Sequence, residues 1–591
     1  MVMTAVPSIV TPGRLAALII TAVTVAELVL IGTVLNPRTF FSGDAGVKYL
    51  QADALVRNRW HSLAVTEPGA AIDPESRFSA LTSNQFARRG PSDPFYGAYS
   101  ELFTVPVSVC LALFGLRGLY VVPLLAGVGT MILTYRLSAR TAPRLAWLAP
   151  ALIGACSPMF FYSVELWEHT LAVLCTTASV WLGVSATERS TAMRYALAGL
   201  LLGLGIAVRE ELYAMLVAGL VAVAWIERPR RIPAAFAAGV GALIGLVPHW
   251  LLKQIEVGRP ARKSVMRVAE VAGVASVQPA EPLRAALWLI VPPWPVWVMT
   301  LALLIGVRAI LPRLAPRQRP PLAVGLAAAI AAWATVGAGS VWGKWQRPDA
   351  LIEAYWPALF LLIAGVPLAS GRAHREIRML LAVSAVFAAT ICVAALLANS
   401  TAPAGSEQWG PRYLLAAMPL LAAAIVFALE RRREWAPRLG LPTGIVVATF
   451  CVLALAGLVV EGQGIRALRQ AKLEYEQVVA ATEAIDRQQV VVSDIWWFPM
   501  VVASIVQDRP VLAADVFTSG PTSDLLPILQ TRGIRALTFV SSDGSSAAAA
   551  QALAAAGWTE VGRRAVRIWL EVRFVEYRRD GDVPAPAAAR S

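Results

Sequence analysis

The sequence of 591 residues is 57% hydrophobic and only 15% charged, which excludes a soluble globular protein whose charged surface must face water. The formal net charge of +14 would suit a nucleic-acid partner, but the arginines fall in short clusters between apolar runs and form no basic patch. The five cysteines lie in or beside apolar segments without metal-ligand spacing. The composition therefore predicts a protein that spans a lipid bilayer.

About thirteen segments are candidates for transmembrane helices, each of which needs roughly 20 apolar residues to cross the bilayer. They lie at 15–35, 118–137, 145–162, 166–184, 194–208, 212–226, 233–252, 284–307, 321–342, 350–370, 379–398, 413–429 and 440–460. The first segment is longer than a signal-peptide core and lacks an Ala-x-Ala cleavage site, so we expect it to remain as an anchor.

The run from Leu102 to Leu116 is interpreted differently, as an amphipathic helix on the outer surface of the membrane. With the N-terminus inside, this choice places most arginine clusters in cytoplasmic loops, as the positive-inside rule requires. Counting the run as a span would invert every later loop. The sequence thus predicts a multi-pass plasma-membrane protein with a cytoplasmic N-terminus.

Three long segments then lie outside the cytoplasm, at 36–117, at 253–283 and after 460. Residues 1–460 are predicted to form the transmembrane module. Residues 461–580 alternate strand-like runs (QVVVSD, PVLAAD, ALTFVSSD) with helix-like runs, which predicts a small extracytoplasmic α/β domain with parallel strands. That domain lacks a phosphate-binding loop motif, so nucleotide binding has no support there. The tail, 581–591, is predicted to be disordered.

The segment FFSGDAGVKYLQADAL follows the first span and places Asp44 at the outer membrane face, with Lys48 one helical turn later. A carboxylate at this position could act as a general base, taking the proton from an acceptor hydroxyl while a glycosyl group leaves a lipid phosphate. The spacing alone also fits a purely structural helix cap, because Gly-Asp before a helix is a common capping arrangement.

The order of these features resembles the GT-C superfamily of integral membrane glycosyltransferases, which includes protein O-mannosyltransferases, lipid A aminoarabinose transferases and actinobacterial cell-wall glycosyltransferases. The resemblance rests on the first span with its acidic loop, the surface helix, and the motifs TYRLSAR, SPMFFYSVELWEH and WGPRYLLAAMPLL. It implies a GT-C-like fold, a polyprenyl-phosphate sugar donor and Asp44 as the catalytic base. Ala45 stands where many members have a second acidic residue, so no cofactor is predicted and a divalent cation has no support in the sequence.

Cationic side chains in the outer loops are the candidates for binding the donor phosphate, which a guanidinium can grip with two parallel hydrogen bonds. These candidates are Arg209, Arg412, Arg347, Lys344, Arg259, Arg262 and Lys263. Arg209 is followed by Glu210 and Glu211, and an internal salt bridge is the alternative explanation there. For the loop at 253–283 the alternative is binding of bulk anionic lipid.

Four further residues are candidates for binding the acceptor or the sugar: Glu165, Glu168, His169 and Trp409. Glu165 and His169 are four residues apart and are predicted to share a helix face. A purely structural pair is the alternative for these two, and an interfacial anchor is the alternative for Trp409.

The predicted function is transfer of a sugar from a polyprenyl-phosphate donor to an extracytoplasmic polysaccharide, glycolipid or protein. Inversion at the sugar carbon is favoured, because a single base and a phosphate leaving group suffice. The main alternative is a transporter or flippase of lipid-linked saccharides, and a third is an inactive scaffold or receptor that binds a cell-wall glycan. Arginine greatly outnumbers lysine, as in high-GC genomes, which favours an actinobacterial cell-wall pathway. The residues leave the sugar, hexose or pentose, and the acceptor open.

Overall fold

The computed structural model describes residues 11–82, 85–88, 93–186, 191–226, 231–257, 351–361, 364, 375–397, 409–437, 441–514, 521–542 and 546–579. The chain divides into two compact units. The helical unit comprises Met1–Leu30, Val122–Leu251 and Ala261–Arg466, and the α/β unit comprises Ile31–Val121, Leu252–Pro260 and Ala467–Ser591. The predicted spans at 284–307 and 321–342 lie outside the described residues.

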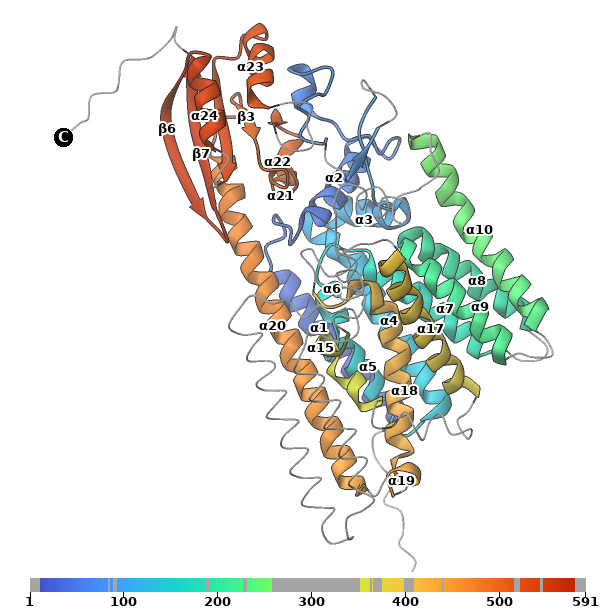
Figure 1. The fold of residues 1–591 in the computed structure, drawn as a ribbon. Coiled ribbons are helices and arrows are strands. Elements are labelled where there is room, and N and C mark those ends of the chain that lie inside the picture. Colours follow the sequence, from blue (N-terminus) through green and yellow to red (C-terminus); the bar gives the residue numbers. More distant parts are fainter. Residues whose placement is uncertain are drawn as a thin grey trace, which may run out of the picture. The chain divides into compact units, whose positions relative to one another are not determined.

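Helices, most of them apolar, make up the described part of the helical unit (Figure 1). They are α1 (Pro12–Val29), α4 (Val121–Thr141), α5 (Leu148–Gly154), α6 (Met159–Ser163), α7 (His169–Val184), α8 (Thr191–Val208), α9 (Tyr213–Ile226), α10 (Arg231–Val257), α15 (Leu351–Ala354), α17 (Arg375–Leu397), α18 (Met418–Glu430), α19 (Arg432–Trp435) and the first part of α20 (Thr443–Glu483). Short 3-10 turns η4 (Glu210–Leu212), η6 (Trp356–Ala358) and η8 (Arg412–Ala417) join some of them.

Among the described residues, 7 helical segments are long and apolar enough to cross a membrane, and His169–Val184 is a shorter apolar helix. The predicted polytopic helical architecture is therefore confirmed, while the number of spans stays a prediction. Two predicted spans are wrong as single helices: the segment 145–162 consists of α5 and α6, separated at Ala155–Pro158, and the described start of 350–370 consists of α15 and the turn η6, separated at Tyr355. Pro158 explains the first break, because proline lacks the backbone N–H that continues a helix and its ring clashes with the preceding turn.

The run at 102–116 forms a helix of its own, α3 (Glu101–Phe114), as predicted. Gly115, at φ 62°, ends this helix in a conformation that favours glycine, and the turn η3 (Gly115–Tyr120) leads into α4. One face of α3 buries Phe103 and Val107, while Leu113 on the other side is 69% exposed. The helix is therefore amphipathic in its packing, and its position on the membrane surface stays a prediction.

A five-stranded sheet forms the centre of the C-terminal part of the α/β unit, in the order β4-β3-β5-β7-β6. The strands are β3 (Val490–Ser493), β4 (Val511–Ala513), β5 (Ala536–Ser542), β6 (Trp558–Arg567) and β7 (Glu571–Arg579). β3 pairs in parallel with β4 and β5, which confirms the three predicted strands and their direction. β6 and β7 add an antiparallel hairpin that the sequence reading did not include. In chain order, helix α23 (Thr522–Thr531) lies between β4 and β5, and helix α24 (Ser546–Ala555) lies between β5 and β6.

The first long loop is built into this same unit. Ile72 and Phe78 lie in one hydrophobic core with strand residues such as Val492 and Phe539. The backbone N–H of Ala513 on β4 donates to the carbonyl of Phe78 over 2.8 Å, so the loop extends the sheet beyond its edge strand. The predicted domain boundary at 461 falls inside α20, which is continuous from Thr443 to Glu483.

Helix α2 (Gly43–Arg57) begins this loop and packs against two short helices of the C-terminal part, α21 (Phe498–Val501) and α22 (Ala503–Val506). Lys472, on the last part of α20, secures the segment that precedes α2. Its ammonium, 1% exposed, donates to the carbonyl oxygen of Thr39 over 2.8 Å and lies 3.1 Å from the hydroxyl of Tyr120. The position of α2 thus depends on residues more than 400 positions away in the chain.

Candidate functional site

Asp44 lies in the first turn of α2 and does not occupy the cap position. Ser42 is the N-cap residue, and it makes no side-chain capping bond. The Asp44 carboxylate accepts a hydrogen bond of 2.8 Å from the side-chain amide of Gln85. A carboxylate in the first helical turn interacts favourably with the helix dipole. The capping alternative is thus not what the structure shows, and the carboxylate is oriented by one amide donor from the same loop.

A group of buried charges lies in the α/β unit around Tyr99. Lys48, one turn after Asp44 and 1% exposed, places its ammonium 3.8 Å from the centroid of the Tyr99 ring. Lys253, at the end of α10, forms an ion pair with Glu101 and also donates to the Tyr99 carbonyl over 3.4 Å. Because each of these charges has an opposite charge or an aromatic face beside it, burial is compensated. Sequence reasoning missed Gln85 and Glu101, since neither position carries a motif.

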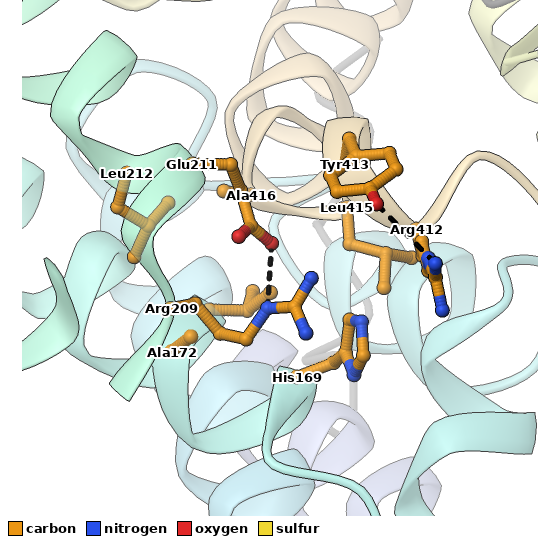
Figure 2. A pocket seen from close by; sticks show the side chains of 10 residues that line it. His169, Ala172, Arg209, Glu211, Leu212, Arg412, Tyr413, Leu415 and Ala416 are labelled. Atoms are coloured by element: carbon orange, nitrogen blue, oxygen red, sulfur yellow. Dashed lines mark hydrogen bonds and ion pairs between the residues drawn. The ribbon is translucent and has the colours of Figure 1, made fainter. Parts of the chain in front are cut away.

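A small pocket in the helical unit gathers several of the predicted binding residues, as Figure 2 shows. Charged and polar side chains on its wall come from three places: the start of α7, the turn after α8 and the turn η8. They are His169, Arg209, Glu211, Arg412 and Tyr413, with Ala172, Val173, Leu212, Leu415 and Ala416 as the apolar lining. Two of the predicted phosphate-binding residues, Arg209 and Arg412, therefore line the same pocket.

Arg209 is held between two carboxylates. Its Nη1 lies 2.8 Å from Glu168 Oε1 and its Nε lies 2.8 Å from Glu211 Oε1. Burial disfavours the guanidinium charge, but Glu211 and Glu168 outweigh burial and raise the pKa of Arg209 above its ordinary value. The salt-bridge alternative thus describes the contacts of this residue. The structure leaves Nη2 of Arg209 without a hydrogen bond to any described residue.

Arg412 and Arg209 flank the ring of Tyr413. Arg412 Nη2 lies 3.2 Å from the Tyr413 hydroxyl, and its guanidinium carbon lies 5.1 Å from the ring centroid. The guanidinium carbon of Arg209 lies 5.9 Å from the same centroid. In Figure 2 both guanidinium groups are directed into the space above His169. Glu168 and Glu211 offset the charge of Arg209, so attraction of an anion to this wall depends mainly on Arg412.

The predicted helix pair of Glu165 and His169 is wrong. Helix α6 ends at Ser163 and α7 begins at His169, so Glu165 lies in the turn between them. The turn packs the fully buried Trp167 into a cluster of three rings, with centroids 5.1 Å from Tyr162 and 5.2 Å from His169, which themselves lie 4.8 Å apart. This aromatic packing requires the chain to leave the helix, which the four-residue spacing alone did not reveal.

The other predicted site residues are either buried in the protein or lie outside the described residues. Trp409 is 4% exposed and stacks on Phe161 at 6.0 Å, so its ring packs in the protein interior. Glu165 and Glu168 are 0% and 1% exposed. The predicted phosphate-binding residues Arg259, Arg262, Lys263, Lys344 and Arg347 lie outside the described residues. In the described part of the chain, no group of three or more His, Cys, Asp or Glu side chains is arranged to hold a metal ion.

Comparisons with known proteins agree on the class of fold. A family model described as dolichyl-phosphate-mannose-protein mannosyltransferase matches residues 102–252. Among curated proteins, none matches the sequence. The structure is similar to that of ArnT from Cupriavidus metallidurans bound to undecaprenyl phosphate, with a TM-score of 0.53, 12% identity, and 95% of this chain and 97% of that chain covered. For ArnT in the apo state the TM-score is 0.53, the identity 11%, and the coverage 95% and 98%.

A further match is the archaeal oligosaccharyltransferase AglB from Archaeoglobus fulgidus, in complex with an inhibitory peptide and a dolichol-phosphate. Here the TM-score is 0.45 and the identity 12%, with 97% of this chain and 75% of that chain covered. The likeness to ArnT, with a TM-score of 0.53, establishes the shared fold. Together with the family match and the apolar helices, it shows a multi-pass membrane protein.

Proposed function

We propose that this chain is an integral membrane glycosyltransferase of the GT-C superfamily and that it transfers a sugar from a polyprenyl-phosphate donor to an extracytoplasmic acceptor. The observation that carries the proposal is the carboxylate of Asp44, set in the first turn of α2 and oriented by Gln85 within a fold shared with ArnT. The acceptor is a hydroxyl of a cell-wall polysaccharide, a glycolipid or a protein.

The choice of donor is supported by the comparisons and by the pocket. ArnT was solved with undecaprenyl phosphate, which is a polyprenyl phosphate. A lipid phosphate carries negative charge, and the pocket wall presents Arg412 and Arg209. We assign the main phosphate contact to Arg412, whose guanidinium lies on the pocket wall with its carbon 5.1 Å from the centroid of the Tyr413 ring.

In the proposed reaction, the acceptor hydroxyl attacks the anomeric carbon of the donor sugar. Asp44 takes the hydroxyl proton, the new carbon–oxygen bond forms, and the bond from the anomeric carbon to the phosphate oxygen breaks with its electron pair on the phosphate. Polyprenyl phosphate leaves. One displacement inverts the anomeric centre, and Gln85 acts only by orienting the carboxylate.

The arginine clusters support a cytoplasmic N-terminus and an extracytoplasmic α/β unit in this proposal. A nucleotide-sugar donor is disfavoured on the same ground, since such donors are cytosolic. The outer-loop residues Arg259, Arg262, Lys263, Lys344 and Arg347 are proposed as further phosphate contacts. Glu165, Glu168, His169 and Trp409 are proposed to support binding of the sugar or the acceptor.

The test is transfer from a panel of radiolabelled polyprenyl-phosphate sugars into membranes that contain the wild type or Asp44→Asn. The matched control is Asp524→Asn, because Asp524 also lies in the first turn of a helix and is exposed. We expect loss of about 10²-fold or more in the Asp44 variant, the scale of general-base catalysis, and no change in the control. Full activity in Asp44→Asn would exclude the proposed base.

A second variant, Arg412→Gln, addresses the donor. We expect a raised KM for the lipid donor with a smaller effect on the KM of the acceptor, since the lost contact is to the donor phosphate. If the wild type transfers sugar from no donor but moves labelled lipid-linked saccharide between leaflets, the protein is a transporter or flippase.

A further inference from the structure

The tip of the β6–β7 hairpin is apolar although its strands are charged. Ile568, Trp569 and Leu570 form the tip, and Trp569 is 63% exposed. On β6, Trp558 and Val566 alone are buried, and the remaining side chains include several exposed arginines. A large aromatic side chain that protrudes from a polar hairpin is a feature of interaction surfaces, because its burial against a partner releases ordered water.

Lys472 on α20 contacts residues that adjoin two apolar helical segments in the chain. Lys472 bonds to Thr39, five residues after the first apolar span ends at Val34. It also contacts Tyr120, the residue directly before α4, within the long apolar helical stretch Glu101–Thr141. Because Lys472 contacts residues next to the first span and next to α4, we expect it near the interfacial layer, where lysine and tyrosine are favoured.

A row of aromatic rings leads from this level to the hairpin tip. Tyr475 follows Lys472 by one helical turn, which is a rise of about 4.5 Å. The Tyr475 and Trp497 ring centroids lie 6.1 Å apart, and the Trp497 and Trp569 centroids lie 5.9 Å apart. In Figure 1, β6 and β7 run beside the C-terminal part of α20, with their tip directed away from the end of that helix. The tip therefore approaches the level that Lys472 marks.

The charges around the tip are those that fit anionic lipid. Arg564 and Arg567 are exposed on β6 next to the tip. The acidic residue closest to it, Glu571, is neutralised by Arg573, whose Nε lies 2.6 Å from its carboxylate. Arginine beside an exposed tryptophan combines phosphate binding with insertion of a ring at the depth of the glycerol and headgroup layer.

We infer that the β6–β7 hairpin is an interfacial membrane anchor of the α/β unit. Trp569 inserts among the lipid headgroups of the leaflet on its own side of the membrane, and Arg564 and Arg567 bind phosphates of anionic phospholipids. The anchor holds the C-terminal part of the α/β unit at the membrane at a second point besides α20. The inference does not depend on the transfer reaction proposed above, since its readout is lipid contact.

The test uses the full chain in nanodiscs, with the five native cysteines replaced by serine and a nitroxide attached at position 569. The matched control label is at Gln551, an exposed position on α24 of the same unit. The accessibility of each label to oxygen, which partitions into lipid, is compared with its accessibility to a water-soluble nickel chelate. We expect the oxygen-to-nickel ratio to be several-fold higher at 569 than at 551, and to fall when anionic lipid is replaced by phosphatidylcholine.

A ratio at 569 equal to that at 551 would show a tip in water and overturn the inference. Shielding of 569 from both reagents would indicate a protein or glycan partner and would also overturn it. A second measurement avoids cysteine replacement. In nanodiscs of brominated lipid, the emission of Trp569 is obtained as the difference between the wild type and Trp569→Phe, and it should be strongly quenched. The emission of Trp558, obtained in the same way from Trp558→Phe, should not be quenched, because the native ring is 3% exposed.

Discussion

Gly46 is the point at which α2 comes closest to the C-terminal part of the chain. A Cβ at this position would overlap the carbonyl oxygen of Met500 on α21, and it would lie 2.8 Å from the carbonyl carbon. Ordinary van der Waals contacts begin at 3.4 Å, so the carbon alone must retreat by about 0.6 Å and the oxygen by more. The atoms on both sides are backbone, so no flexible side chain can give way. The substitution Gly46→Ala must therefore displace α2 or α21.

Two effects of this substitution oppose each other. Alanine favours a helix over glycine by about 1 kcal/mol, which would stabilise α2. Overpacking typically costs about 1–3 kcal/mol, and a backbone-to-backbone overlap lies at the upper end of that range. We expect net destabilisation, seen as a fall of several degrees in the thermal midpoint of the detergent-solubilised protein. Because Asp44 is two residues away in the same turn, a shift of about 1 Å should lower sugar transfer by about 10²-fold.

The matched control is Gly462→Ala on α20, where an added Cβ meets nothing within 4 Å. It should leave activity unchanged and keep or slightly raise the thermal midpoint. If Gly46→Ala matched the wild type in both midpoint and transfer, the packing of α2 on α21 would be wrong. Loss of transfer with an unchanged midpoint would contradict the overpacking argument and leave only a local effect on Asp44.

Two further predictions concern charged groups. Burial raises the pKa of Glu67 to about 7, although hydrogen bonds from Ser79 and Ala80 act to lower it. The contribution of Glu67 to the free energy of unfolding is therefore full below pH 4.5, its ordinary pKa, and is lost as pH rises through 7. The thermal midpoint of Glu67→Gln should vary less with pH over this range than that of the wild type, and the same pH profile in both would refute the assignment. Arg209→Gln should lower the free energy of unfolding by about 3–5 kcal/mol, because it removes the cation that pairs with Glu168 and Glu211. Adding Glu168→Gln should restore part of this free energy, and simple additivity of the two variants in unfolding experiments would disprove the coupling.

Local sequence was sufficient for the features that depend on the surroundings of a single segment. Apolar runs such as that of α17 were predicted as spans because the bilayer requires every buried backbone group to be paired within its own helix. Strands β3, β4 and β5 were predicted from short β-branched runs, and α3 was separated from α4 by the charges of later loops. Asp44 was singled out because it follows the first span directly.

The composition of the pocket was only partly predictable. Arg209, Arg412 and His169 were each selected for a charged or polar side chain near the end of an apolar run. The pairing of Arg209 with Glu168 joins the turns before α7 and after α8, 41 positions apart, and no spacing rule specifies it. The error for Glu165 has the same origin, since the turn brings the rings of Tyr162, Trp167 and His169 into one cluster, which no spacing rule specifies.

The sequence by itself determined that the chain spans a membrane and which residues form many of its helices. It also identified the carboxylate at the start of the first loop. The tertiary structure alone decided that this loop and the C-terminal strands share one core, through Ile72 and Phe78, and that Lys472 and Met500 hold the helix of Asp44. The physical reason is the sequence separation over which each interaction acts. The free energy of transferring a segment into lipid depends on the composition of that segment alone, whereas packing and ion pairing depend on which distant segments the fold brings into contact.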